Sequence, residues 1–516
     1  MRRFRPRLAL PFIALLAAAP LAAQLPPLTA PRGMARLELS GRFDNWDQMY
    51  FGGVKRDAAG DFIRDPANGA WLPSLAFVEQ RIHQITGAAT VSLSLGKTSA
   101  HELVNLGTES IGAAYGLTRR LTLFGTIPIV RVRVQDVVSL DSTHATAGFN
   151  PADPTFGGGD HGAETNTFLG LLTSALNSLR SKLETPDQIP PAQRPLAEAT
   201  LARGTALKTD LDAFFASSTF VPLTGTAGAA AINGSVDSIR SRLNDFGIPL
   251  TAPLGFPTAG LAHDALEGFA TNASGPIQAQ PFEPPILKYI GDIEVGAAFL
   301  WLDHRPKSGG LTLRSALQGT VRLRTGKLAD PASFFSLGTG DRQPDVQGDL
   351  VTEVGGGHFG ARVTARYVLQ LPGRQSRRLT PPDQPIAPAS TLADVERDPG
   401  EIMEGVLEPY LRIASHFSIV GGIRHWAKGL DKYKYVPNQD SIPGTTPDVL
   451  ALGSKENGTT LSAALSFVHD GLRKDGTTGA PIDAVLRGEL VVGSSQGRVP
   501  VRQSLSFMLR IYRKLF

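Results

Sequence analysis

The chain has no cysteine among its 516 residues, so it forms no disulfide and offers no thiolate as a nucleophile or metal ligand. It also has little net charge. Its 51 Lys and Arg residues nearly balance 47 Asp and Glu residues, which gives +4, and the charges are interspersed rather than clustered. Nothing in this pattern points to nucleic acid. Beyond the N-terminal residues, the chain lacks any apolar run long enough for a membrane-spanning helix.

Motifs for catalysis and metal binding are also scarce. The 10 histidines include no H-E-x-x-H pattern and no close pair suited to zinc. The stretch from Gly493 to Gly497 matches the G-x-S-x-G pattern of hydrolases. It lies between two expected strands, however, where glycine and serine are ordinary turn residues. We therefore expect no enzyme activity, no metal site and no cofactor.

The N-terminus has the order of regions found in an export signal. Four arginines within the first seven residues are followed by an apolar run from Leu8 to Leu16 and by mostly small residues up to Ala23. This order predicts a secretory signal peptide, residues 1–23, with cleavage between Ala23 and Gln24. An exported chain without a spanning helix is either a free protein or a closed barrel, because only helices and barrels satisfy their backbone in lipid.

The chain does contain repeated alternation of apolar and polar residues. From Leu311 to Leu323 mostly apolar residues take every second position, and threonine, glutamine and arginine stand between them. Since side chains alternate across a strand, one face would meet lipid and the other water. Repeated arginines and carboxylates on the polar face suit a wet lumen better than a soluble sandwich. The sequence thus predicts an all-β protein: a closed antiparallel transmembrane β-barrel in the outer membrane of a Gram-negative-type bacterium.

About twelve segments alternate, an even number as bacterial barrels require. The expected strands span residues 35–43, 109–115, 121–135, 287–301, 311–325, 349–354, 359–371, 402–413, 417–428, 459–469, 482–492 and 501–515. A phase change near Pro128 predicts a β-bulge in the third strand. Ala88 to Leu95 also alternates, so a count of about fourteen stays open. Short turns and long links mostly alternate, which places the short turns and both termini on the periplasmic side.

Residues 136–285 interrupt the strand rhythm with apolar residues at helical spacing. They divide the chain into residues 24–135 with the first strands and a long loop, the helical insert 136–285, and residues 286–516 with the remaining strands. Ser235 is expected to begin the last helix of the insert and Gly247 to end it. The insert is either a cap whose apolar faces pack on one another or a lid that contacts a greasy substrate. Its candidate core residues are Phe168, Leu172, Leu176, Leu179, Phe214, Phe215, Ile239 and Leu243.

The polar face of the expected strands is the candidate functional surface. Both signs of charge occur on it, so cross-strand pairs can neutralise one another. This face is either a structural network that fills the lumen or a polar translocation path. The lumen-lining candidates are Arg36, Glu38, Arg42, Arg131, Arg133, Lys288, Asp292, Glu294, Arg314, Arg322, Arg324, Arg362, Arg366, Glu404, Glu408, Arg412, Asp483, Arg487 and Glu489.

One hairpin carries a family resemblance. The stretch Tyr115-Gly116-Leu117-Thr118-Arg119-Arg120-Leu121-Thr122-Leu123, continuing to Ile127-Pro128-Ile129, resembles an element of outer-membrane barrels described as transporters of phenol and aromatic-degradation pathways. These are distant relatives of long-chain fatty-acid and hydrocarbon channels. The resemblance implies diffusive uptake of small, poorly soluble molecules. The chain departs from that group in one respect: we find no N-terminal plug segment, because Leu25 to Arg32 is only a short Pro-rich lead.

The sequence therefore favours a channel for small apolar or aromatic solutes, working by passive or facilitated diffusion, with the solute unknown. The main alternative is a non-transporting barrel that anchors a helical module for binding a partner. A barrel-embedded hydrolase or protease is a third class. Expected partners are outer-membrane lipid and lipopolysaccharide, and the barrel-assembly machinery. That machinery reads an amphipathic last strand with a terminal aromatic residue, here Phe516.

Overall fold

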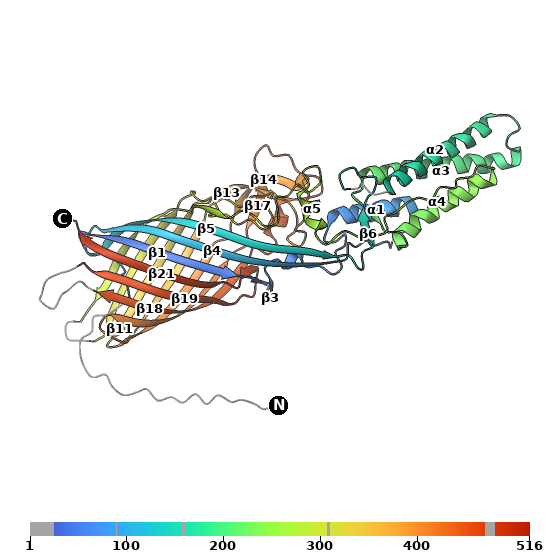
Figure 1. Ribbon diagram of the computed structural model, residues 1–516. Coiled ribbons are helices and arrows are strands. Elements are labelled where there is room, and N and C mark those ends of the chain that lie inside the picture. The colour runs from blue at the N-terminus through green and yellow to red at the C-terminus, as the bar shows by residue number, and fades with distance from the viewer. Residues whose placement is uncertain (1–24, 89, 157–160, 307–309, 470–479, 516) are drawn as a thin grey trace, which may run out of the picture.

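The computed structural model describes residues 25–88, 90–156, 161–306, 310–469 and 480–515. The expected signal peptide, its cleavage site after Ala23 and the terminal Phe516 lie outside these residues. Figure 1 shows a β-barrel from which two long strands, β4 and β5, lead to a group of helices beyond one end. The C-terminus lies at the other end.

The barrel is a closed ring of 12 antiparallel strands. Neighbours along the ring follow chain order, and the first strand closes the ring by pairing with the last, from Met34 opposite Lys514 to Asn45 opposite Gln503. The strands are β1 (Met34–Trp46), β4 (Lys97–Gly116), β5 (Leu121–Asp141), β9 (Glu294–His304) with the short β8 (Leu287–Ile290) before it, β10 (Thr312–Arg322), β11 (Asp345–Gly356), β12 (Phe359–Gln370), β15 (Ile402–Arg412), β16 (Phe417–Lys428), β18 (Glu456–His469), β19 (Ile482–Gly493) and β21 (Gln503–Lys514).

The predicted barrel of about twelve strands is thereby confirmed, and the count of about fourteen is wrong. Residues 88–95 were the candidate for an extra strand. Within the described part of that segment, Ser94 forms only an isolated bridge with Asn68. Alternation over so short a stretch does not make a strand without a neighbour that continues the hydrogen-bond ladder.

Alternation along the strands produces an apolar outer surface. On β1, Leu37, Leu39 and Phe43 are exposed on the outward face, whereas Glu38 is among the inward positions. Outward leucines, isoleucines, valines and phenylalanines recur on the strands around the ring. A soluble protein does not leave so large an apolar surface in contact with water. The chain is therefore an outer-membrane β-barrel whose outward side chains face lipid.

The predicted bulge in the third strand at Pro128 is wrong, because the irregularity lies opposite β5, between β8 and β9. β5 pairs with β4 without any shift from Asp141 to Thr122. On its other side, Thr126 pairs with Glu294 but Ile129 pairs with Ile290, so residues 291–293 face only residues 127 and 128. Proline has no N–H to donate to this ladder. Its carbonyl accepts a 2.8 Å hydrogen bond from Gly291, and β5 keeps its phase.

The helices form a cap built from two loops. Its elements are α1 (Pro73–Thr86), β6 (Ala147–Phe149), α2 (His161–Glu184), α3 (Arg194–Ser217), β7 (Phe220–Pro222), α4 (Ala227–Asp245) and α5 (Ala265–Thr271). α1 comes from the first long loop, and the other elements come from the predicted insert. Among the described helices, none combines the length and apolar character required to cross a membrane.

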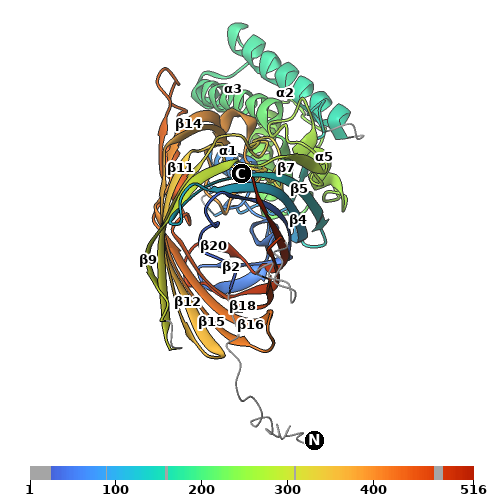
Figure 2. The ribbon, with the colours of Figure 1, turned by 90° about the vertical axis from the view of Figure 1, so that its left-hand side faces the viewer.

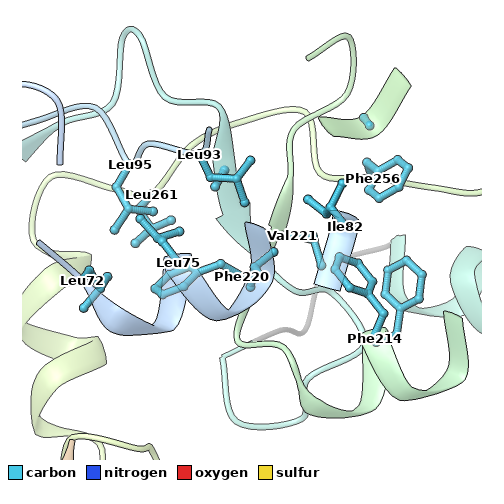
Figure 3. Close-up of a cluster of buried hydrophobic side chains, with 14 of the residues drawn as sticks. Leu72, Leu75, Ile82, Leu93, Leu95, Phe214, Phe220, Val221, Phe256 and Leu261 are labelled. Atoms are coloured by element: carbon cyan, nitrogen blue, oxygen red, sulfur yellow. The ribbon is translucent and has the colours of Figure 1, made fainter. Parts of the chain in front are cut away.

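The cap is built around a hydrophobic core that continues to buried residues of β4 and β5 at this end of the barrel. Leu75 and Ile82 of α1 are fully buried with Phe214 of α3, Phe220 of β7 and Phe256 (Figure 3). All eight predicted core residues of the insert are buried in this cluster. One detail differs from expectation and another agrees with it. The last long helix begins at Ala227, so Ser235 lies inside it, while Gly247 follows its end with φ +69 as a stop requires.

Smaller elements join the strands at the cap end. One sheet combines β2 (Gln48–Phe51), β3 (Val54–Asp57) and β20 (Arg498–Pro500), and another combines β13 (Gly373–Arg378), β14 (Leu392–Asp398) and β17 (Lys432–Tyr435). Short 3-10 helices are η1 (Gly60–Phe62), η2 (Pro191–Gln193), η3 (Ala389–Thr391) and η4 (Pro447–Ala451). Seen from the end that carries the C-terminus, β2 and β20 are visible through the opening, and α2 and α3 lie to one side of it (Figure 2).

Candidate channel lumen

Charged side chains on the inward face form cross-strand pairs because the strand register aligns them. Asp349 of β11, Arg366 of β12 and Glu404 of β15 are direct neighbours in register. The Arg366 guanidinium contacts the Asp349 carboxylate at 2.8 Å and the Glu404 carboxylate at 3.2 Å. The Arg424 guanidinium extends the row to Glu404 at 3.8 Å. The charges in this row neutralise one another within the barrel wall.

A second row repeats the arrangement four residues further along the same strands. Glu353, Arg362 and Glu408 are aligned in register. The Arg362 guanidinium donates to the Glu353 carboxylate at 2.6 Å. Glu408 forms its ion pair with Arg487 of β19, on the lumen side of the wall, and not with its neighbour in register, Arg362. The paired charges thus connect strands that are not adjacent.

The opposite wall carries a similar network. Arg42 of β1 lies 2.9 Å from Asp44 and 3.1 Å from Glu489. Nearer the C-terminal end of the barrel, Arg510 donates to Glu38 at 2.6 Å. With these partners, the inward face carries many charges that largely cancel locally.

The Pro-rich lead occupies the lumen, which corrects the expectation that this chain has no plug-like segment. Leu25 is only 4% exposed and packs with Tyr410, Val420 and Ala464 of three different strands. The backbone carbonyl of Pro26 accepts a 2.8 Å hydrogen bond from Arg362. Short contacts to strands far along the sequence hold this segment inside the barrel.

The other end of the segment is fixed at the β4–β5 turn. The backbone N–H of Ala30 donates a 2.8 Å hydrogen bond to the hydroxyl of Thr122, and both groups are buried. Gly116 packs directly against the carbonyls of Ala30 and Pro31, leaving no room for a β-carbon. Gly33 then donates to the Gly116 carbonyl, at 2.8 Å, where β1 begins. We call residues 25–32 the N-terminal plug.

Two cavities adjoin the plug. One of about 420 Å³ is lined by Leu25 and Pro26 together with Val420, Val485 and Met508, and with the charged pairs of Arg42 and Arg487. The other, of about 230 Å³, is lined by Pro26, Pro27 and Leu28 and by residues of β5, β10, β11 and β12. Since Pro26 belongs to both walls, the plug lies between the two cavities.

The structure places most of the candidate lumen residues in the inward networks. Arg322 lies 3.4 Å from Glu294 and 3.0 Å from Asp345. Asp345 was not among the candidates from the sequence. Arg314 and Arg412 are buried near the C-terminal end of the barrel. Sequence reasoning also missed three buried residues of the inward face, Asp349 and Glu353 of β11 and Tyr410 of β15.

Five candidates do not line the lumen as expected. Arg131, Arg133 and Lys288 are exposed on the outward face, because β5 keeps its phase past Pro128. Arg324 lies beyond the end of β10 in a surface pocket with Arg342, Arg374 and Glu396. Asp292 accepts backbone hydrogen bonds from Gly326 and Asp341 at 2.7 and 3.2 Å, so it anchors a loop.

The G-x-S-x-G stretch is the turn between β19 and β20. The hydroxyl oxygen of Ser495, the serine of the motif, accepts a hydrogen bond from the side-chain amide of Asn457, at 2.7 Å. Asn457 accepts from the backbone N–H of Ser495, at 2.8 Å. The motif therefore holds a hairpin turn, and its serine hydroxyl is engaged there.

A separate acidic group lies where β4 and β5 project beyond the lipid-facing part of the barrel. Glu102 and Asp136 are direct cross-strand neighbours, and Asp57 of β3 and Glu283 lie nearby. Burial and the Asp57 carboxylate raise the pKa of Glu102 to about 7. Burial and the Glu102 carboxylate raise the pKa of Asp136 to about 8. This junction between barrel and cap therefore retains protons at neutral pH.

Comparisons with known proteins give only structural likenesses. No protein-family model matches the chain. No curated protein matches its sequence. Among solved structures, an outer membrane channel from Pseudomonas putida F1 is similar at a TM-score of 0.40 and 9% identity, covering 94% of this chain and 96% of that one.

Two further likenesses are weaker. The monoaromatic hydrocarbon channel CymD has a TM-score of 0.25 and 8% identity, with 94% of this chain and 90% of that chain covered. A Pseudomonas aeruginosa FadL homologue has a TM-score of 0.24 and 8% identity, with the same coverage. The barrel assignment rests on the closed strand order of this chain itself.

Proposed function

We propose that this barrel is a channel through which small uncharged solutes, apolar or aromatic, cross the outer membrane by diffusion. The observation that carries the proposal is the placement of the N-terminal plug between two cavities inside the lumen. The plug is held by the Arg362–Pro26 and Thr122–Ala30 hydrogen bonds and by packing of Leu25. So small a set of contacts can break and reform without disturbing the strand ladder.

The charges in the lumen support uncharged solutes. Arg366, Arg362 and Arg42 each contact a carboxylate at 3.1 Å or less. A charged solute would have to displace such partners and leave buried charges uncompensated, which is costly. A neutral solute leaves the pairs intact.

The cavities support small solutes. An apolar cavity of roughly 150 Å³ is enough to hold benzene. The larger of the two cavities measures about 420 Å³ and has Val420, Val485 and Met508 on its wall. A single aromatic ring fits this space, with apolar side chains to contact it and serine hydroxyls beside them.

The test is solute flux into liposomes that contain the purified full-length protein. We expect entry of a neutral monoaromatic compound to exceed that of its carboxylated analogue, and deletion of residues 25–28 to raise entry of both. Deletion of the four exposed residues 185–188, in the link between α2 and α3, is the control and should leave both rates unchanged. Equal rates for protein-free and protein-containing liposomes, with and without the plug, would refute the proposal.

A second candidate function is display of the cap by a non-transporting barrel. The observation that favours it is that α2, α3 and α4 extend away from the barrel and α2 and α3 lie beside the opening rather than across it (Figures 1 and 2). The same liposomes separate the two functions. A barrel that stays sealed after plug deletion supports display of the cap.

A further inference from the structure

Three cations on the outer wall of the barrel have no carboxylate partner within the described part of the chain. Arg131 and Arg133 of β5 and Lys288 of β8 are exposed, and among the described residues no ion pair involves them. The lumen arginines Arg366 and Arg42, by contrast, each contact two carboxylates. The unpaired cations therefore have free hydrogen-bond donors that the fold itself does not use.

The strand register brings these cations together. Arg131 lies directly opposite Lys288 on one side and Gly107 on the other, and Phe43 is opposite Gly107. Arg133 follows in the next outward row. A β-carbon on Gly107 would have no atom within 4 Å, so the glycine leaves a gap in the row. The result is an outward notch of about 460 Å³, which we call the basic notch.

The composition of the basic notch changes along the membrane normal. Ile129, and Ile127 two residues further toward the turn, continue the outward face into the apolar surface. Glu109 lies at the same lower edge, opposite Ile129, and is the one carboxylate in the wall of the notch. Three cations thus face one anion at the boundary where the apolar surface ends.

The leaflet follows from the direction of the strands. β5 begins at the short turn after Gly116 and runs from there toward the cap, so the basic notch lies at the end with the long loops. In bacterial outer-membrane barrels that end faces outward, and short turns face the periplasm. The notch is therefore level with the headgroups of the outer leaflet, whose lipid carries phosphates on its lipid A part.

We infer that the basic notch binds a phosphate group of lipid A, with Arg131, Arg133 and Lys288 donating to its oxygens and the acyl chains lying against Ile129 and Ile127. Arginine matches phosphate by parallel N–H donors, and lysine adds a point charge. The gap at Gly107 gives the phosphate room between Phe43 and Arg131.

The experiment measures lipid bound to the full-length protein in detergent by native mass spectrometry. The probes are diphosphoryl lipid A, dephosphorylated lipid A, phosphatidylglycerol and inorganic phosphate. We expect diphosphoryl lipid A to bind, and its affinity to fall by about tenfold or more in the triple variant R131Q/R133Q/K288Q, because several charge-assisted hydrogen bonds are lost. Dephosphorylated lipid A should bind weakly to both proteins.

The matched control is R119Q/R120Q/K514Q, which removes two arginines and one lysine from exposed positions at the opposite end of the barrel. It should bind diphosphoryl lipid A as the unmodified protein does. Heat-dependent migration in gels shows that each variant retains a closed barrel. Binding that does not change in R131Q/R133Q/K288Q overturns the proposal. So does equal binding of dephosphorylated lipid A, or full displacement of lipid A by phosphatidylglycerol or inorganic phosphate.

Discussion

Arg362 donates a 2.8 Å hydrogen bond from its guanidinium to the backbone carbonyl of Pro26, 336 residues earlier in the chain. The same guanidinium binds Glu353 at 2.6 Å. One side chain therefore belongs to two structures, the charged wall of the lumen and the N-terminal plug. Weakening the plug without disturbing the wall requires a residue other than Arg362.

Thr122→Val is such a change. It keeps the side-chain shape but removes the acceptor for the buried N–H of Ala30. An unpaired buried donor costs about 1–3 kcal/mol, so the plug should leave its position more often. We expect larger and more frequent openings in single-channel recordings. Thr108→Val, at a position that lines the same cavity as Leu25 and Pro26 but does not hydrogen-bond to the plug in the described structure, is the control. Identical recordings for the two variants would contradict the role given to Thr122.

Gly116→Ala should displace the plug by steric contact. The new methyl group would lie 2.7 Å from the Ala30 carbonyl oxygen and still closer to that of Pro31, and backbone atoms there have little freedom to move. We expect protease added to the periplasmic side to cut the N-terminal segment faster. Gly405→Ala, where a β-carbon meets no atom within 4 Å, should not change the cutting rate. Equal protection in both variants would show that the plug tolerates the methyl group.

Phe214→Asp with Phe215→Asp should open the cap while the barrel stays closed. Both rings are buried in the cap core, and truncation of a buried phenylalanine costs about 3–5 kcal/mol before the added charge is counted. The barrel depends on its own hydrogen-bond ladder. We expect external protease on intact cells to cut residues 161–245 in this variant, with heat-dependent gel migration unchanged. The control replaces two exposed cap residues, Leu171→Asp with Leu196→Asp, and should resist cutting.

The acidic junction should loosen as pH rises. The pKa of Asp136 is about 8 in the folded junction, against an ordinary value of 3.8. The carboxyl keeps its proton when folded and loses it when the junction opens, so stability falls from about pH 4 up to about pH 8 and then levels off. Glu102 acts in the same direction up to about 7.

Hydrogen exchange of residues 97–105 and 133–141, corrected for intrinsic rates, measures this opening. Exchange should be faster at pH 9 than at pH 5, and Asp136→Asn should remove most of the difference. Asp210→Asn, at an exposed position on α3 away from the junction, should leave the difference intact. A junction whose exchange is independent of pH would contradict the link between protonation and opening.

The barrel could be predicted from sequence because alternation is a local signal. Each strand shows it within about ten residues, and a barrel repeats it many times. The ends were less predictable. The first part of β4, from Lys97 to Glu102, is mostly polar and is held by pairing with β5, which no local pattern reveals. α1 was missed for a similar reason, since its apolar face is complete only against α3 and α4.

The functional site was less predictable than the fold. Alternation separates two faces but does not show where lipid ends, so Arg131, Arg133 and Lys288 were assigned to the wrong side. What the sequence shows near Pro128 is not a phase shift. The outward face of β5 continues unbroken, and its residues change there from apolar to charged. The plug has no periodic pattern at all, because its conformation depends on Arg362, Tyr410 and Thr122.

The position of Leu25 has a consequence for biogenesis. Its neighbours Tyr410, Val420 and Ala464 belong to strands made in the last quarter of the chain, so they do not exist as a wall when Leu25 is synthesised and exported. Leu25 therefore reaches its place only after β15, β16 and β18 have formed this wall. Protection of the plug from protease would then report that the C-terminal strands have assembled around a segment exported long before them.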